Sequence, residues 1–191
     1  MTNLRDCDLT PYEDGPDGHQ FSGRSLAREI GAERTGFGVY ELEPKQATIG
    51  SSYKAVFAVP HGCAGSATIK IRVQIPEGVI GAKPMPKAGW NVEAISGKYA
   101  SEYDYHGSKL TEGVKEVVWS GGKLPDHNYD EFVISTFLTG GLKPNTMLYF
   151  PVVQECEQGV SRWIDTPREG DEGHGHGSKS PAPGVKLMPK P

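Results

Sequence analysis

The strict alternation of apolar and polar residues over 68–75 constrains the fold of this chain more than any other feature. Isoleucine or valine occupies every second position and polar side chains occupy the others, as in a β-strand with one buried face. Burying four such side chains stabilises a fold by roughly 6 to 12 kcal/mol before conformational entropy is counted. A register slip of one residue would expose all four, so the alternation specifies which face meets the core.

Six further segments have the length and composition of strands, and turn-forming residues separate them. The pair Gln158 and Gly159 fits a tight hairpin. No helical periodicity lies between the segments, which argues against a parallel α/β sheet. The pattern therefore predicts an all-β, immunoglobulin-like antiparallel β-sandwich, with residues 84–87 as a connecting loop. The predicted strands are 52–59, 68–75, 90–96, 113–119, 131–138, 146–154 and 160–164.

The two ends of the chain differ from this body in composition. Residues 1–38 lack an apolar central stretch and carry acidic residues early, so they do not read as a secretory signal peptide; only 25–34 has helical character. Residues 168–191 are charged and rich in glycine and proline. We expect a mostly disordered leader over 1–38, a sandwich domain over 39–167 and a flexible His/Gly/Pro-rich tail over 168–191.

Charge and hydropathy narrow the classes of function. The formal net charge of −4 gives no reason to expect nucleic acid or an anionic membrane as a partner. No apolar run approaches the roughly 18 to 20 residues that span a bilayer, so no transmembrane segment is predicted. The sequence also shows no convincing catalytic triad, carboxylate pair or phosphate-binding loop, which predicts a protein that is not an enzyme.

Several motifs in one order resemble the YcnI-like copper-binding family, which comprises small exported bacterial β-sandwich proteins. The resemblance covers about residues 42–167 and rests on GSSYKAVFAVPHGCAGSATIKIRVQIPEGV, KPMPKAGW, VVWSGG, LPDHNYDEF and LYFPVVQECEQGVSRWIDTP. It implies a non-enzymatic protein of copper homeostasis in the periplasm or at the cell surface. Such a protein would capture Cu(II) at one edge of the sandwich and pass it to a copper chaperone or copper importer of the envelope.

In that family the mature chain begins at a histidine, in a pattern like His-Val-Thr-Leu-Glu, whose amine and imidazole bind copper beside a carboxylate and a tryptophan. The corresponding stretch here is VYELE over 39–43, and Val39 stands where the resemblance places the histidine. Glu43 and Trp119 remain as candidate copper ligands. The alternative is that Trp119 is a core residue and Glu43 a surface carboxylate.

The departure at Val39 leaves two questions of function and location open. It favours a second hypothesis, an immunoglobulin-like interaction module that has lost the family's metal site. A periplasmic or extracellular location follows from the resemblance alone. Because the chain as given shows no signal peptide, a cytoplasmic location stays open.

Three cysteines leave at least one unpaired within the chain. We predict a disulfide between Cys63 and Cys156, with Cys7 left over, which would require an oxidising compartment. The alternative is a pair of buried thiols. His61 and Cys63 as a base and a nucleophile are disfavoured, because two residues apart on a tight turn they are poorly placed to bond each other.

A histidine-containing tract, DEGHGHG, lies near the C-terminus and carries His174 and His176. Two imidazoles with two carboxylates on a flexible segment could chelate copper, nickel or zinc. The alternative is a solvated linker with incidental metal affinity.

Other side chains that could carry chemistry are weaker candidates. Met85 and Met188 could offer thioether sulfur to Cu(I), although a lone methionine is more often a surface or gap-filling residue. His106 and His127 are expected to be surface histidines. A cluster of aromatic residues could form a binding edge or a solvent-facing strand: Tyr99, Tyr103 and Tyr105.

Overall fold

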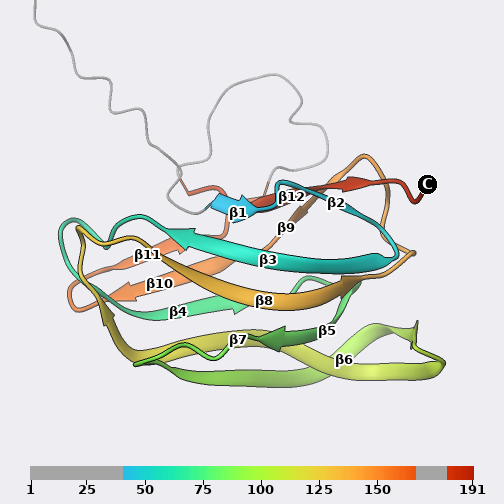
Figure 1. The fold of residues 1–191 in the computed structure, drawn as a ribbon, viewed down its shortest axis with the longest axis horizontal. Helices are drawn as coiled ribbons and strands as arrows, with labels where there is room; N and C mark the ends of the chain where they lie inside the picture. The colour runs from blue at the N-terminus through green and yellow to red at the C-terminus, as the bar shows by residue number, and fades with distance from the viewer. Residues whose placement is uncertain (1–40, 167–179) are drawn as a thin grey trace, which may run out of the picture. The chain divides into compact units, whose positions relative to one another are not determined.

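The computed structural model describes residues 41–166 and 180–191. All regular secondary structure in these residues is β-strand, as the sequence predicted, and the strands form three sheets (Figure 1). Because the described residues contain no helix, none of them provides a helix able to cross a membrane. The predicted leader over 1–38, Val39, His174 and His176 lie outside the described residues.

The first sheet has four antiparallel strands, in the order β1–β3–β8–β5. Phe57 of β3 pairs with Leu42 of β1 on one side and with Phe132 of β8 on the other. All three side chains are buried, so this row forms one wall of the core. The strands are β1 (Glu41–Glu43), β3 (Ser51–Val59), β8 (Asp130–Leu138) and β5 (Val79–Pro84).

The second sheet has five antiparallel strands, in the order β11–β10–β4–β7–β6. β6 and β7 form one long hairpin that extends to the lower right in Figure 1, well beyond the predicted strands 90–96 and 113–119. The predicted hairpin at Gln158 and Gly159 is present, because Glu155 of β10 pairs with Val160 of β11. The strands are β4 (Thr68–Gln74), β6 (Asn91–Tyr105), β7 (Ser108–Leu124), β10 (Val152–Cys156) and β11 (Val160–Trp163).

The predicted alternation of buried and exposed side chains is present in β4 except at the start of the strand. Ile71 and Val73 are fully buried, as predicted, but Ile69 is only partly buried and Thr68 is fully buried instead. The register against β7 shifts between Thr68 and Lys70, and this irregularity changes which side chain faces inward.

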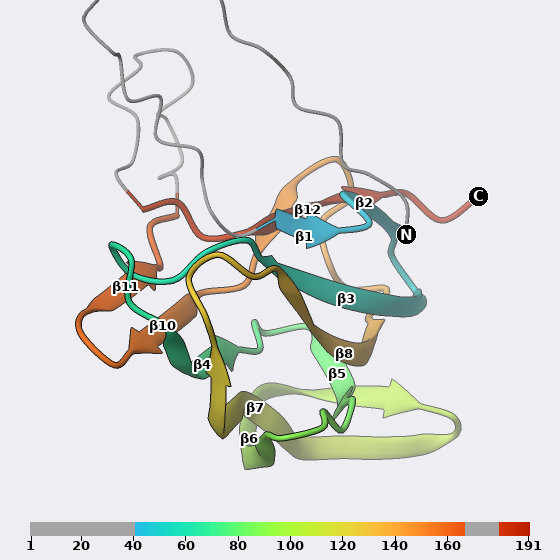
Figure 2. The same cartoon turned by 60° about the vertical axis from the view of Figure 1, so that its left-hand side comes forward.

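The third sheet corrects the prediction for the C-terminus. Residues 180–191, expected to belong to a flexible tail, include β12 (Gly184–Met188), which pairs in parallel with β2 (Gln46–Thr48) and antiparallel with β9 (Met147–Tyr149). Val185 and Leu187 point into the core, with 0% and 1% of their surfaces exposed. Figure 2 shows β12 beside β1 and β2. The domain therefore extends past the predicted boundary at 167.

The predicted strand 146–154 is interrupted. It divides into β9 and β10, which belong to different sheets. Phe150 and Pro151 lie between the two strands, and the Phe150 side chain is fully buried with its ring centroid 5.7 Å from that of Phe57. The chain thus crosses from one sheet to another at a buried aromatic residue.

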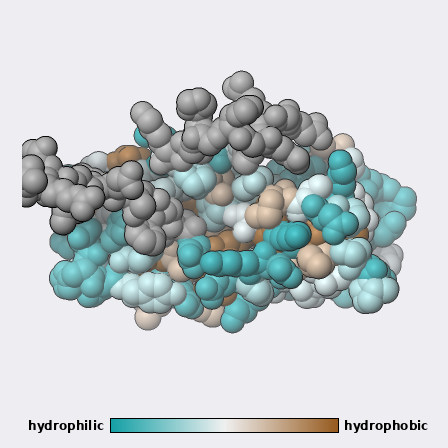
Figure 3. All heavy atoms as spheres, turned by 90° about the horizontal axis from the view of Figure 1, so that it is seen from above, coloured by the Kyte–Doolittle hydropathy of each residue, from teal (hydrophilic) through white to brown (hydrophobic). Residues whose placement is uncertain are grey.

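Side chains of all three sheets meet in one hydrophobic core, and Trp119 is the largest fully buried residue in it. Outside the core, large apolar residues are scattered singly, as Met85 and Met147 are. Figure 3 shows one face on which hydrophilic residues prevail and hydrophobic areas are small. Exposed apolar residues scattered in this way are normal for a protein surface and do not by themselves mark a binding site.

Candidate functional site

The predicted disulfide between Cys63 and Cys156 is present, with 5.9 Å between the two Cα atoms. It joins the loop after β3 to the end of β10. Because the sulfur of Cys63 is in this bridge, Cys63 offers no thiol as a nucleophile. His61 Nδ1 instead lies 2.7 Å from the carbonyl oxygen of Gly62. The base–nucleophile reading of His61 and Cys63 is therefore wrong for this structure.

A buried polar side chain supports the loop beside the disulfide. Gln154 is fully buried, and its Nε2 donates to the carbonyl oxygen of His61 at 2.8 Å and to Thr68 Oγ1 at 2.7 Å. The N–H of Gly62 donates to Asp126 Oδ1 at 3.0 Å. Gly62 admits no side chain, because a Cβ there would lie 1.8 Å from the carbonyl oxygen of Ser66. These contacts give the bridge region a structural role.

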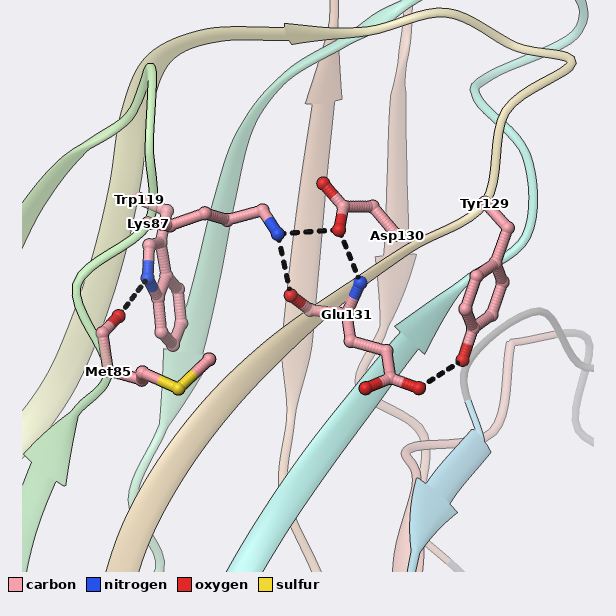
Figure 4. A network of polar contacts seen from close by, with 6 residues as sticks. All are labelled: Met85, Lys87, Trp119, Tyr129, Asp130 and Glu131. Carbon is pink, nitrogen blue, oxygen red and sulfur yellow. Dashed lines mark hydrogen bonds and ion pairs between the residues drawn. The ribbon is translucent and has the colours of Figure 1, made fainter.

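Trp119 lies in the core, which agrees with the alternative prediction that it is a core residue. None of its surface is exposed, and its ring centroid is 5.3 Å from that of Phe132. The indole Nε1 donates to the carbonyl oxygen of Met85 at 3.5 Å (Figure 4). An indole N–H only donates hydrogen bonds, so this contact ties β7 to the segment after β5.

Glu43 lies on the exposed side of β1, while its neighbour Leu42 points into the core. It belongs to the four-stranded sheet, whereas Trp119 belongs to the five-stranded sheet. One side chain is exposed and the other is buried. The structure therefore does not bring the two predicted ligands together into one exposed site.

A polar network at the start of β8 was missed by sequence reasoning (Figure 4). Lys87 Nζ donates to Asp130 Oδ1 at 2.5 Å and to the carbonyl oxygen of Glu131 at 2.9 Å. It also lies 4.9 Å from the centre of the Phe132 ring. Tyr129 donates its hydroxyl proton to Glu131 Oε1 at 2.7 Å. The Asp130 carboxylate in LPDHNYDEF was a signal of polar contacts, but its partner Lys87 is 43 residues away.

The Tyr129 hydroxyl lies against the carboxylate of Glu131. The hydrogen bond to Glu131 and partial burial raise the pKa of Tyr129 to about 12, and the charges of Glu131, Glu43 and Asp130 add to this effect. The phenolate would be repelled by these carboxylates, so the protonated phenol is favoured. Glu43 of β1 thus acts on Tyr129 through its charge.

We expect the Tyr129 ring to titrate near pH 12 and Glu131→Gln to lower that pKa, because the variant removes the charge but keeps a hydrogen-bond acceptor. Since the folded-state pKa is raised above about 10, the contact favours the folded state below pH 10, and its contribution is lost as the pH rises toward 12. NMR titration of the ring measures this. Glu41→Gln, on the same strand as Glu43, is the control, and an equal shift in both variants would contradict the assignment.

The described residues contain no group of three or more histidine, cysteine or carboxylate side chains that could hold a metal ion. His106 and His127 are exposed, in agreement with their expected place on the surface. Met85 is 51% exposed and Met188 is partly buried. The tract that carries His174 and His176 is outside the described residues.

The predicted aromatic cluster lies on β6 and faces other parts of the protein. Tyr99 and Tyr103 pack edge to face with ring centroids 5.4 Å apart, and Tyr105 packs on Phe137 of β8 at 5.5 Å. A Cβ on Gly113 would lie 1.9 Å from the Tyr99 hydroxyl oxygen, so a side chain there would displace the Tyr99 ring from its place over β7. These rings therefore help to hold the hairpin in place.

Comparison with known proteins agrees with this fold. Residues 40–187 match the family described as "Domain of unknown function (DUF1775)". No curated protein matches the chain. The crystal structure of an uncharacterized protein from Nocardia farcinica, described as revealing an immunoglobulin-like fold, matches with a TM-score of 0.55 and 22% identity over 78% of this chain and 97% of that chain. That likeness confirms the predicted immunoglobulin-like sandwich. The family match covers most of the chain, so this protein belongs to the DUF1775 family.

Proposed function

We propose that this protein binds copper and passes it on, without catalysing a reaction, in the bacterial cell envelope. The YcnI-like motifs that suggest this role lie within the region matched by the family. The observation that carries the proposal is the exposed position of Glu43, which stands where the resemblance places the carboxylate ligand. Carboxylate oxygen and imidazole nitrogen together suit Cu(II). The disulfide supports an oxidising compartment, as an envelope location requires.

Two backbone hydrogen bonds support a contribution of nitrogen ligands by the histidine tract. Asp165 N–H donates to the carbonyl oxygen of Ser180 at 3.1 Å, and Ala182 N–H donates to that of Asp165 at 2.8 Å. The two chain segments that bracket residues 167–179 are therefore adjacent. Pro181 and Glu41 line the same cleft, so the described chain resumes at residue 180 close to β1. We infer that His174, His176 and the β1 carboxylates act on one copper ion.

Copper titration of the full chain tests this proposal. We expect submicromolar Cu(II) binding, a loss of at least about tenfold in His174→Ala with His176→Ala, and a smaller loss in Glu43→Gln. A variant with His106→Ala and His127→Ala removes the same number of imidazoles and is the matched control. Substitutions are preferable to truncation, because removing the C-terminal residues would also remove β12.

The outcomes separate the possible sites. Loss in the tract variant alone would mean that only the tract chelates copper, and equal loss in the control would mean that imidazoles bind without a site. Electron paramagnetic resonance of the Cu(II) complex should show nitrogen couplings that disappear with the tract histidines. Absence of submicromolar binding in the wild-type protein would contradict the copper proposal.

A second candidate is an immunoglobulin-like interaction module that has lost metal binding. The complete burial of Trp119 favours it, because this residue presents no exposed atom to a metal. Val39, in place of the family's histidine, favours it too. A wild-type protein that folds, keeps its disulfide and binds no copper would support this second candidate.

A further inference from the structure

A cleft of about 620 Å³ lies between the β6–β7 hairpin, the turn before β5 and the loop after β8. We call it the hairpin cleft. It is distant in sequence from Glu43 and the histidine tract, and it has no part in the proposed copper function. The side chains that matter below are Glu77, Asp104, Phe137, Thr139 and Leu142.

One wall of the hairpin cleft is held in place by Glu77. Its Oε1 accepts hydrogen bonds from the N–H of Ala100 at 3.0 Å and the hydroxyl of Tyr103 at 2.7 Å, and its Oε2 lies 2.8 Å from Lys115 Nζ. Partial burial opposes ionisation of Glu77, but these hydrogen bonds outweigh it and lower the pKa. The hairpin is therefore fixed against the turn, and the cleft is preformed, which reduces the entropic cost of binding.

The charge at the hairpin cleft favours a cationic ligand. No lysine, arginine or histidine lines it. Glu77 is paired with Lys115 and Glu102 with Lys109, whereas Asp104 has no ion pair within the described part of the chain. Lys109 lies opposite Asp104 in the β6–β7 register, so the three lining carboxylates are balanced by two lysines and the cleft keeps an excess of one negative charge.

The floor of the hairpin cleft is apolar and contains an unpartnered hydroxyl. Phe137 and Leu142 supply the apolar surface. Only 6% of the Thr139 surface is exposed, and its Oγ1 has no hydrogen-bond partner among the described residues. A buried hydroxyl without a partner is unfavourable in a folded protein.

Leu142 and Thr139 lie close to each other at the floor of the cleft. A Cβ on Gly78 would lie 2.6 Å from Leu142 Cδ2 and 3.4 Å from Thr139 Oγ1, so both side chains lie against Gly78. Leu142 is partly exposed, and both Leu142 and Thr139 line the cleft. The floor can therefore offer an apolar surface and a hydrogen-bonding group to the same ligand.

We propose that the hairpin cleft binds a lysine or arginine side chain of a partner polypeptide. Such a side chain has an apolar stem that fits the floor at Phe137 and Leu142, and a cationic head group that fits the rim at Asp104. The Thr139 hydroxyl oxygen accepts a hydrogen bond from one N–H group of the head group. This atom thereby gains the partner that it lacks in the protein alone. The interaction involves no metal.

Binding can be measured by NMR titration of the full chain, with a chelator present, using acetyl-Gly-Lys-Gly-amide as the probe and acetyl-Gly-norleucine-Gly-amide as its uncharged match. We expect the lysine peptide to shift the amide signals of Gly140 and Gly141, which line the hairpin cleft, and to bind at about millimolar concentration. The norleucine peptide should bind about five-fold or more weakly, because it lacks the charge.

Three variants test the assignment of side chains. Asp104→Asn should weaken binding about three-fold, and Glu93→Gln, which alters an exposed carboxylate on the same strand, should leave it unchanged. Thr139→Val should weaken binding about five-fold without lowering the unfolding midpoint, since it removes a hydroxyl that has no partner. Gly141→Phe should weaken binding, because it adds a bulky side chain to a residue that lines the cleft, and a Cβ there meets no atom within 4 Å.

Three results would overturn the proposal. The first is equal binding of the lysine and norleucine peptides, and the second is no shift at roughly 10 mM peptide. The third is unchanged binding in Gly141→Phe. Because the titration contains no copper, each of these results leaves the proposed copper function standing.

Discussion

Deletion of residues 184–191 should leave the domain unfolded, and Leu187→Ala should lower the free energy of unfolding by about 2 to 5 kcal/mol. Only 1% of the Leu187 surface is exposed, so alanine leaves a cavity where β12 meets the core. The whole strand contributes more to stability than this one side chain. The N–H of Leu187 also donates to the carbonyl oxygen of Thr146 at 2.8 Å, and the carbonyl oxygen of Met188 accepts from the N–H of Ile49 at 3.0 Å. A loss of this size is a large fraction of the 5 to 15 kcal/mol that stabilises a typical domain.

Lys186→Ala is the matched control for this prediction. Lys186 lies between Val185 and Leu187 on the same strand, but its side chain is exposed. Its replacement should change the free energy of unfolding by less than about 0.5 kcal/mol. Denaturant unfolding followed by tryptophan fluorescence measures both variants. Equal midpoints for Leu187→Ala and Lys186→Ala would show that β12 does not belong to the folded core.

The sequence did not predict β12, and the reason is physical. Its segment contains only two residues that become fully buried, within a stretch rich in proline, glycine and lysine. Its partners β2 and β9 are three residues long and distant along the chain. Strands this short have too few alternating positions to show a period, so long-range pairing decides their structure.

The strongest strand signal shows a similar limit. The alternation over 68–75 correctly placed Ile71 and Val73 in the core, but it could not reveal that the register shift against β7 would bury Thr68. Irregular pairing depends on the partner strand. Sequence reasoning is therefore reliable for the existence of a long strand and weaker for the side chains next to an irregularity.

The sequence predicted the candidate site only in part, because the missed contacts also depend on partners far away along the chain. Pairing of Cys63 with Cys156 was predicted, since cysteine is rare in this chain and few pairings exist. The network that joins Lys87 to Asp130 and Glu131 was missed, because a charged residue carries no mark of a partner many residues away. The position of Glu43 in the motif VYELE identified it as a candidate copper ligand. Only the structure showed that Glu43 and Trp119 lie in different sheets and that one is exposed and the other buried.

Replacing both bridge cysteines, in Cys63→Ala with Cys156→Ala, should lower the free energy of unfolding by roughly 4 to 5 kcal/mol. The two residues are 93 positions apart, and cross-linking so long a loop removes much conformational entropy from the unfolded chain. The loss should be visible as a lower denaturant midpoint. Part of the effect would come from small cavities, because both cysteines are more than 90% buried.

Reductant separates the cross-link from these cavities. Dithiothreitol should destabilise the wild-type protein by most of the same amount, while it should leave the double variant unchanged because that variant has no bridge to reduce. Cys7→Ala serves as the background for all measurements, since it excludes exchange with the third cysteine. If thiol titration shows full reduction of the wild-type bridge and the midpoint does not move, the bridge does not stabilise the fold. A large loss would instead make the folded domain dependent on an oxidising compartment, which is the condition that the proposed envelope location requires.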